Sequence, residues 1–372
     1  MRTLVVGLIE RPADLETLDE TVSLCKTEGL DVVKVITQRR DSPDSKTLVG
    51  RGKLYEILKT AQDLGIELVV FDKLLKPSQW KEITKVIDVK VIDRAMLILD
   101  IFARRAQSAE GKLKVELAQL EYNLPRLTEM DSGLSRLVGG IGGRGPGETK
   151  LEVSRRRTRD RIKALRERLL SLEKHRDRTM RLQRKSKIPL VSIVGYTNAG
   201  KSSLFNAIVS RQDSVVKDQL FATLDPLRRR VELFENGQRL PIILADTVGF
   251  IHDLPTQIAD AFKATIGEVA ASDLLLIVVD ASDPQAVRKF KNVMSILREL
   301  GADTDEAIVV LNKIDVKIPD VVEEFSEFNP VHCSALKGIN IQELKRRIFE
   351  NLAKRGSAIQ AQPSEARKSG IQ

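Results

Sequence analysis

A run of residues near the middle of the chain has the types and order needed to hold a phosphate chain. The apolar segment 190–194 is followed by a loop that begins at Gly195 and ends in Gly200-Lys201-Ser202. The residues after this loop have helical character. Glycines let backbone amides turn inward around a β-phosphate, a lysine reaches the β- and γ-oxygens, and a following serine hydroxyl binds Mg²⁺. The pattern predicts a P-loop whose nucleotide-binding residues are Gly195, Tyr196, Thr197, Asn198, Ala199, Gly200, Lys201, Ser202 and Ser203.

A second apolar strand, 242–245, ends in Asp246-Thr247-Val248-Gly249, about 45 residues after the P-loop lysine. A carboxylate at this strand end can hold Mg²⁺ through a water molecule, and the Gly249 amide can donate to the γ-phosphate. The sequence therefore predicts that Ser202 and Asp246 hold Mg²⁺ and that Lys201 and Gly249 act on the transferred phosphoryl group.

A third pattern selects the base. Asn312-Lys313-Ile314-Asp315 follows the apolar segment 307–311, and Ser334-Ala335 lies about twenty residues further on. Guanine presents N1–H and N2–H as adjacent donors, which the Asp315 carboxylate can accept together, whereas adenine lacks this pair. The Lys313 stem would lie along the base, Asn312 would brace the loop, and the Ala335 amide would meet O6. The predicted ligands are GTP and GDP.

Two further blocks precede these motifs. In residues 1–106, apolar runs alternate with amphipathic ones, which predicts a small parallel α/β sheet. In 107–187, leucines and one isoleucine recur at heptad spacing in two runs, which predicts a long antiparallel helical hairpin. The predicted seam residues are Leu113, Leu117, Leu120, Leu124 and Leu127 in one helix and Ile162, Leu165, Leu169 and Leu172 in the other.

The hairpin has two features that indicate a polyanionic partner. Its tip, 131–149, contains six glycines within 139–147, so it is expected to be mobile until a partner orders it. The stretch 150–187 holds 16 basic and 5 acidic residues, although the whole chain has a net charge of only +9. Such a concentration favours nucleic acid, with a solvated helix face as the alternative. The candidate RNA-binding residues are Arg136, Arg144, Arg155, Arg156, Arg157, Arg159 and Arg161.

With these motifs in place, residues 188–352 resemble a translation-factor-class GTPase domain. The preceding region, through the run 139–148 and Glu148-Thr149-Lys150-Leu151-Glu152, resembles the HflX family of bacterial and archaeal ribosome-associated GTPases. The resemblance covers nearly the whole chain. It implies binding to the large ribosomal subunit and its rRNA, with the hairpin tip near the peptidyl-transferase centre, and separation of stalled or idle 70S ribosomes.

The resemblance also implies details of the site. Thr223, in Phe221-Ala222-Thr223-Leu224-Asp225, looks like the first-switch hydroxyl for Mg²⁺ and a catalytic residue. Phe250 stands where many GTPases have a water-orienting glutamine, which implies slow intrinsic hydrolysis. Asn198 is similar to the asparagine of GTPases that bind K⁺, with a loop-stabilising role as the alternative. Residues 228–230 are three arginines that could supply a finger in cis, or else face solvent or rRNA.

The sequence thus predicts a P-loop GTPase domain with a mostly parallel doubly wound sheet at 188–352, preceded by an α/β domain and the basic hairpin. A disordered tail is expected at 353–372, where some family members have a further domain. Two cysteines are too few for a disulfide framework, and no apolar run approaches the ~20 residues of a membrane span. A cytoplasmic monomer is expected, and peripheral membrane association stays open.

Two other functions fit the same residues. One is a ribosome-assembly or tRNA-modification GTPase. The other is an RNA-binding scaffold with a nucleotide-sensing site. A weaker motif, Gly50-Arg51-Gly52-Lys53, could hold a phosphate at a helix start, although a plain turn is the favoured interpretation.

Overall fold

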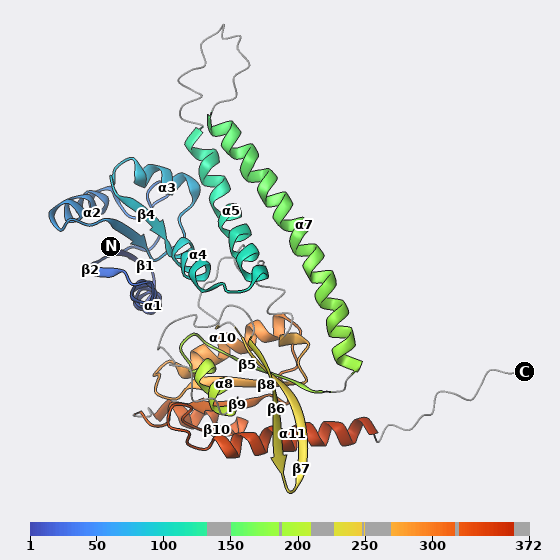
Figure 1. Cartoon of the computed structure of the whole chain (residues 1–372). Helices are drawn as coiled ribbons and strands as arrows, with labels where there is room; N and C mark the ends of the chain where they lie inside the picture. The colour runs from blue at the N-terminus through green and yellow to red at the C-terminus, as the bar shows by residue number, and fades with distance from the viewer. Residues whose placement is uncertain are drawn as a thin grey trace, which may run out of the picture. The chain divides into compact units, whose positions relative to one another are not determined.

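A computed structural model of the chain describes residues 1–131, 150–185, 188–209, 227–247, 249, 269–316 and 320–360. These residues fall into two compact units, one up to Arg178 and the other from Thr179 onward. Each unit is described by itself (Figure 1). Within the described residues, no helix is both long enough and apolar enough to cross a membrane.

The first unit begins with alternating strands and helices. The elements are β1 (Arg2–Ile9), α1 (Asp14–Thr27), β2 (Asp31–Arg39), α2 (Arg51–Asp63), β3 (Leu68–Phe71), α3 (Pro77–Thr84), β4 (Lys90–Asp93) and α4 (Arg94–Arg105). The strands are all parallel, in the order β2-β1-β3-β4. The inner strands β1 and β3 are buried almost throughout, because helices cover both sheet faces. The predicted parallel α/β sheet is confirmed.

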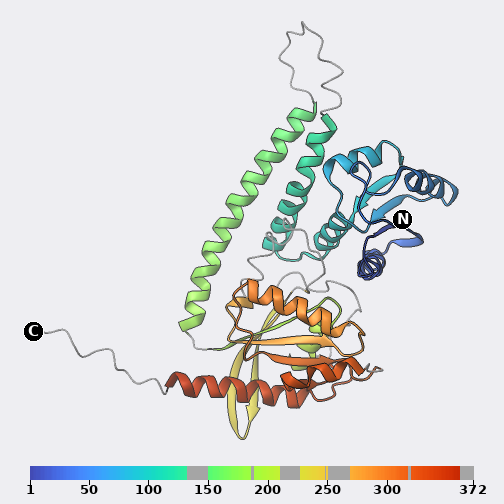
Figure 2. The ribbon, with the colours of Figure 1, turned by 180° about the vertical axis from the view of Figure 1, so that it is seen from behind.

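Two long helices, α5 (Ala109–Asp131) and α7 (Lys150–Lys185), lie side by side and run in opposite directions (Figures 1 and 2). Their apolar seams form one cluster, which contains all the predicted seam residues except Leu127 and Leu172. Ion pairs flank it, with Arg161 Nε 2.7 Å from Glu116 and Arg166 Nη2 2.7 Å from Glu121. The tip 132–149 lies outside the described residues.

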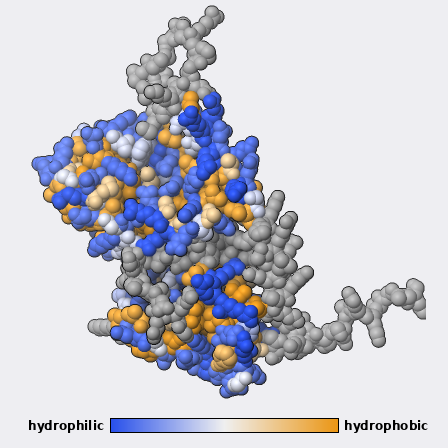
Figure 3. Space-filling view, viewed as in Figure 1, coloured by the Kyte–Doolittle hydropathy of each residue, from blue (hydrophilic) through white to orange (hydrophobic). Residues whose placement is uncertain are grey.

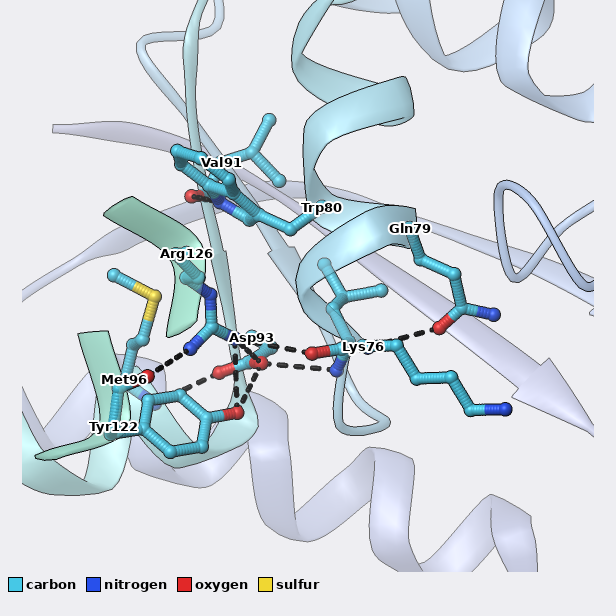
Figure 4. A network of polar contacts seen from close by, with 9 residues as sticks. Lys76, Gln79, Trp80, Val91, Asp93, Met96, Tyr122 and Arg126 are labelled. Atoms are coloured by element: carbon cyan, nitrogen blue, oxygen red, sulfur yellow. Dashed lines mark hydrogen bonds and ion pairs between the residues drawn. The ribbon is translucent and has the colours of Figure 1, made fainter. Parts of the chain in front are cut away.

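A buried polar network fixes α5 to the α/β sheet (Figure 4). At its centre is Asp93, the last residue of β4, which is completely buried. Its Oδ2 accepts from the Tyr122 hydroxyl at 2.5 Å, from Arg126 Nη2 at 2.6 Å and from the Leu75 amide at 3.0 Å. Its Oδ1 accepts from the Met96 amide and so caps α4. One carboxylate therefore joins β4, α4, α5 and the loop after β3.

The second unit contains a six-stranded sheet in the order β10-β9-β8-β5-β7-β6. Its strands are β5 (Leu190–Gly195), β6 (Leu227–Glu235), β7 (Gln238–Asp246), β8 (Leu274–Asp280), β9 (Ile308–Asn312) and β10 (Val331–His332). All pairs are parallel except β6 with β7. The edge strand β6 was not anticipated, because its three arginines hide the usual strand pattern.

Helices cover both faces of this sheet. One core cluster includes side chains of α8 (Lys201–Val209) and α11 (Ile341–Gln360), and the other includes α10 (Ala286–Glu299) and the 3-10 helix η1 (Asp320–Phe328). Figure 1 shows α10 and α11 on opposite faces. The predicted doubly wound, mostly parallel GTPase fold is confirmed.

The C-terminal helix differs from the sequence prediction, which starts a disordered tail at 353. Helix α11 instead continues to Gln360. The side chain of Arg355 supports this extension, because its Nε lies 2.5 Å from Glu306 Oε2 and its Nη2 lies 3.4 Å from Asp303. Residues 361–372 lie outside the described residues.

Candidate functional site

The candidate site lies at the carboxyl ends of the central strands of the second unit. The P-loop follows β5, Asp246 ends β7, Asp280 ends β8 and Asn312 ends β9. The register pairs Ile193 with Asp246 and Asp280 with Asn312. Because parallel strands end at one sheet edge, motifs far apart in the sequence meet there, as is usual for ligand sites of doubly wound sheets.

The P-loop backbone requires glycine at two positions. At Gly195, φ is +151°, and a Cβ atom would lie 2.3 Å from the Val278 carbonyl oxygen of β8. At Gly200, φ is +87°, and a Cβ atom would lie 2.2 Å from Asn312 Nδ2. Asn198 also has a left-handed backbone, with φ of 63°, which asparagine tolerates better than most residues. The loop is therefore packed closely against β8 and against Asn312.

Lys201 and its neighbours form the phosphate-facing part of the site. The Lys201 ammonium is buried and donates to the Tyr196 carbonyl oxygen at 2.7 Å. Burial lowers the pKa of Lys201 to about 8, although the negative charge of Asp246 opposes this shift. A phosphate would supply the opposite charge that the buried lysine needs. The arrangement suits an anionic ligand.

Ser202 and Asp246 lie next to each other in the site. The Ser202 hydroxyl donates to Asp246 Oδ2 at 2.7 Å, and Asp246 is 1% exposed. A hydroxyl and a carboxylate in this position are oxygen donors of the kind that Mg²⁺ prefers. Thr223, the third residue predicted to hold the metal, lies outside the described residues.

Gly249 lies directly over the P-loop. A Cβ atom at this position would be 2.8 Å from Lys201 Nζ and 2.9 Å from Thr197 Cα. The absence of a side chain thus lets this backbone approach the lysine, and the contact of Gly249 with a γ-phosphate stays a prediction. The next residue, Phe250, lies outside the described residues.

Asn312 connects the P-loop to the base-binding loops. Its Nδ2 donates to the Ala199 carbonyl oxygen at 2.9 Å, and its Oδ1 accepts from the Ala335 amide at 2.9 Å. The bracing role predicted for Asn312 agrees with this geometry. The Ala335 amide, however, which was expected to meet guanine O6, is used by Asn312, because that side chain brings an acceptor within reach.

Asp315 is the residue predicted to bind guanine. It is exposed, and a hydrogen bond with the buried Ser334 side chain is the main cause that lowers the pKa of its carboxyl. The carboxylate is therefore ionised at neutral pH and oriented by Ser334. Lys313 precedes it with a left-handed backbone, φ 68°.

Sequence reasoning missed one functional side chain. Asp280, at the end of β8, was not among the predicted site residues, yet it lies 2.8 Å from Lys313 Nζ. This ion pair orients the lysine whose stem is expected along the base. The signal was available, because Asp280 ends an apolar strand in the same way as Asp246 does.

The arginines of α7 divide into two groups. Arg155 is partly buried and donates to the Leu127 carbonyl oxygen at 3.4 Å, and Arg161 pairs with Glu116. Both contribute to hairpin packing. Arg156, Arg157 and Arg159 are exposed, and the upper part of α7 is hydrophilic in Figure 3. Arg136 and Arg144 lie outside the described residues, and residues 228–230 belong to the edge strand β6.

Family models match the chain in three consecutive segments. Residues 15–103 match a GTP-binding GTPase N-terminal model, 105–184 a GTP-binding GTPase middle-region model, and 190–313 a 50S ribosome-binding GTPase model. The chain is 45% identical to the GTPase HflX of Caldanaerobacter subterraneus subsp. tengcongensis, with 95% of the chain and 81% of that protein covered. The chain belongs to the HflX family of GTPases. Its identity to the Escherichia coli GTPase HflX is 43%, with 91% and 80% covered.

Two solved structures with bound GDP are also similar to the chain over nearly its whole length. The structure of SsGBP in complex with GDP aligns with 96% of this chain and with 100% of the SsGBP chain, at 29% sequence identity and a TM-score of 0.55. A GTP-binding protein from Sulfolobus solfataricus with GDP covers 95% and 100%, at 28% identity and a TM-score of 0.50. As an HflX GTPase, the chain binds GTP and hydrolyses it to GDP and phosphate, which confirms the predicted enzyme class.

Proposed function

We propose that this HflX GTPase is a GTP-dependent switch that binds the large ribosomal subunit and separates stalled or idle 70S ribosomes in the cytoplasm. The observation that carries the proposal is the combination, in one chain, of a domain matching a 50S ribosome-binding GTPase model and a helical hairpin with a basic face. In this account, γ-phosphate contacts at Gly249 order the switch segments, and the hairpin engages rRNA.

Mg²⁺ would be held by Ser202 directly and by Asp246 through water, and Thr223 would add a second hydroxyl. The ion would neutralise charge on the β- and γ-phosphates during transfer. The buried Asp246 carboxylate beside the Ser202 hydroxyl supports this assignment. Lys201 would move from the Tyr196 carbonyl to the phosphates, and Gly249 would donate its amide to the γ-phosphate.

K⁺ is proposed as a second cofactor, bound beside the phosphates with help from Asn198. The Asn198 side chain is exposed, and its left-handed backbone supports the loop-stabilising alternative as well. We expect hydrolysis to be roughly tenfold or more faster in K⁺ than in Na⁺ at equal ionic strength, because a cation there replaces part of an arginine finger. Asn198→Ala should remove the difference. Equal hydrolysis rates in K⁺ and Na⁺ would exclude a K⁺-binding role for Asn198.

Sedimentation with purified subunits tests the ribosome assignment. The chain should comigrate with 50S subunits in a non-hydrolysable GTP analogue and be released in GDP. Replacing both Arg157 and Arg159 by glutamine should reduce the slope of log K against log salt by about 1.5, because two phosphate contacts are lost.

A matched control removes the same charge elsewhere. Lys291 and Arg298 are exposed on α10, and their replacement by glutamine should leave the slope unchanged. Comigration only with subunit precursors would indicate an assembly factor instead. Equal slopes for the α7 variant and the parent would make the basic face a solvated surface.

A further inference from the structure

The P-loop has a contact that belongs to none of its sequence motifs. Tyr196, the second residue of the loop, is partly buried and packs against the core on the α10 side of the sheet. The ammonium of Lys289, on α10, lies 5.1 Å from the centroid of the Tyr196 ring. This is within the range of a cation–π interaction.

The Lys289 ammonium is itself held in place. Its Nζ lies 2.5 Å from Asp283 Oδ2, in the turn between β8 and α10. The other oxygen of that carboxylate accepts from the Gln285 amide at 2.9 Å, which fixes Asp283 at the helix start. The lysine head therefore has a defined position between a fixed carboxylate and the tyrosine ring. Only 33% of its side chain is exposed.

The same tyrosine also holds the phosphate-binding lysine. The Tyr196 carbonyl oxygen accepts from Lys201 Nζ at 2.7 Å and from the Ala199 amide at 3.3 Å. A shift of Tyr196 would therefore move the groups that surround the β-phosphate. The loop contacts β8 at Gly195 and is hydrogen-bonded to Asn312 at Ala199. The Lys289 contact with Tyr196 is a third restraint on the loop, between these two.

We propose that Lys289 is a positioning residue for the nucleotide site, which acts through the Tyr196 ring to hold the P-loop in its binding conformation. It touches neither nucleotide nor metal in this account. The P-loop surrounds the β-phosphate, which GTP and GDP share. Loss of the Lys289–Tyr196 contact therefore weakens the binding of both nucleotides by the same factor. This inference concerns the GTPase site alone and does not depend on the ribosome.

Equilibrium titration of the full chain with fluorescent GDP and a fluorescent non-hydrolysable GTP analogue tests the proposal. Lys289→Met keeps the stem and removes the charge, and it should raise both Kd values about two- to fivefold. Lys289→Arg should restore affinity, since a guanidinium also binds a ring face. The control Lys291→Met, at an exposed position of the same helix, should bind like the parent.

A double-mutant cycle separates this role from a simple ion pair with Asp283. In a Tyr196→Leu background, Lys289→Met should have no further effect, because the ring is already absent. An equal loss in both backgrounds, or no loss in the parent, would overturn the proposal. If the Tyr196 variant does not fold, the comparison of Lys289→Met with Lys289→Arg still decides, because equal losses in both would also overturn it.

Discussion

Replacing Asp315 by asparagine should weaken GTP binding by more than about tenfold, since the asparagine amide nitrogen, a donor, would then face a guanine N–H donor. The ionised carboxylate is exposed and oriented by Ser334, so it can accept both N1–H and N2–H. An asparagine amide offers one oxygen and places its nitrogen against the second donor. Xanthosine triphosphate has an acceptor at that position and should bind better to the variant than to the parent.

The measurement is a competition titration of both triphosphates against the parent and the variant. Asp305→Asn, at an exposed aspartate just before β9, is the matched control and should leave both affinities unchanged. Equal GTP affinity in the parent and Asp315→Asn would remove the assignment of Asp315 to guanine.

The second large effect is expected in the first unit. Arg126→Ala should destabilise it by about 3–5 kcal/mol, because the buried Asp93 carboxylate loses its charged partner. Burial raises the pKa of Tyr122, so its hydroxyl stays protonated and remains a donor, but a neutral donor cannot replace the guanidinium. The side chains of Arg126 and Asp93 are 5% and 0% exposed, so water cannot compensate for the loss.

Trp80 reports this unfolding directly. It is the only tryptophan in the chain, it lies in α3, and its Nε1 donates to the Val91 carbonyl oxygen of β4 at 3.1 Å. Urea unfolding followed by its fluorescence should show the loss. A double variant, Asp93→Asn with Arg126→Met, should recover most of it, because it removes both buried charges while asparagine can still cap α4.

Arg161→Met serves as the control on the same hairpin. Its ion pair with Glu116 is largely exposed, so its replacement should change stability far less. A loss for Arg126→Ala no larger than that of the control would show that the Asp93 network does not fasten α5 to the sheet.

Local patterns in the sequence were enough to predict the two α/β folds, the helical hairpin and the strands that carry the nucleotide motifs. Strand β3, Leu68–Phe71, lies in the block predicted to form a parallel α/β sheet, because an apolar run between turns is a local signal. The P-loop, Asp246 and Asn312 were placed correctly at strand ends because each motif is contiguous and follows its own strand.

Pairings between distant elements could not be read in this way. Heptad spacing marks the apolar seam of α5, but nothing local shows that Arg126 reaches back 33 residues to Asp93. The same holds for Lys289 and Tyr196, which come together only when α10 packs on the sheet. Strand β6 forms because β7 supplies hydrogen bonds along its whole length, despite its three arginines.

The central claim, GTP-dependent separation of ribosomes, is tested most directly by light scattering of 70S particles after mixing with the full chain. With GTP, scattering should fall as subunits separate, whereas GDP should have no effect. A variant lacking residues 139–147 should hydrolyse GTP at the intrinsic rate of the parent and leave scattering unchanged, because the HflX resemblance implies that the glycine-rich tip binds near the peptidyl-transferase centre. Unchanged scattering with the parent and GTP, or normal splitting by the deletion variant, would contradict this account.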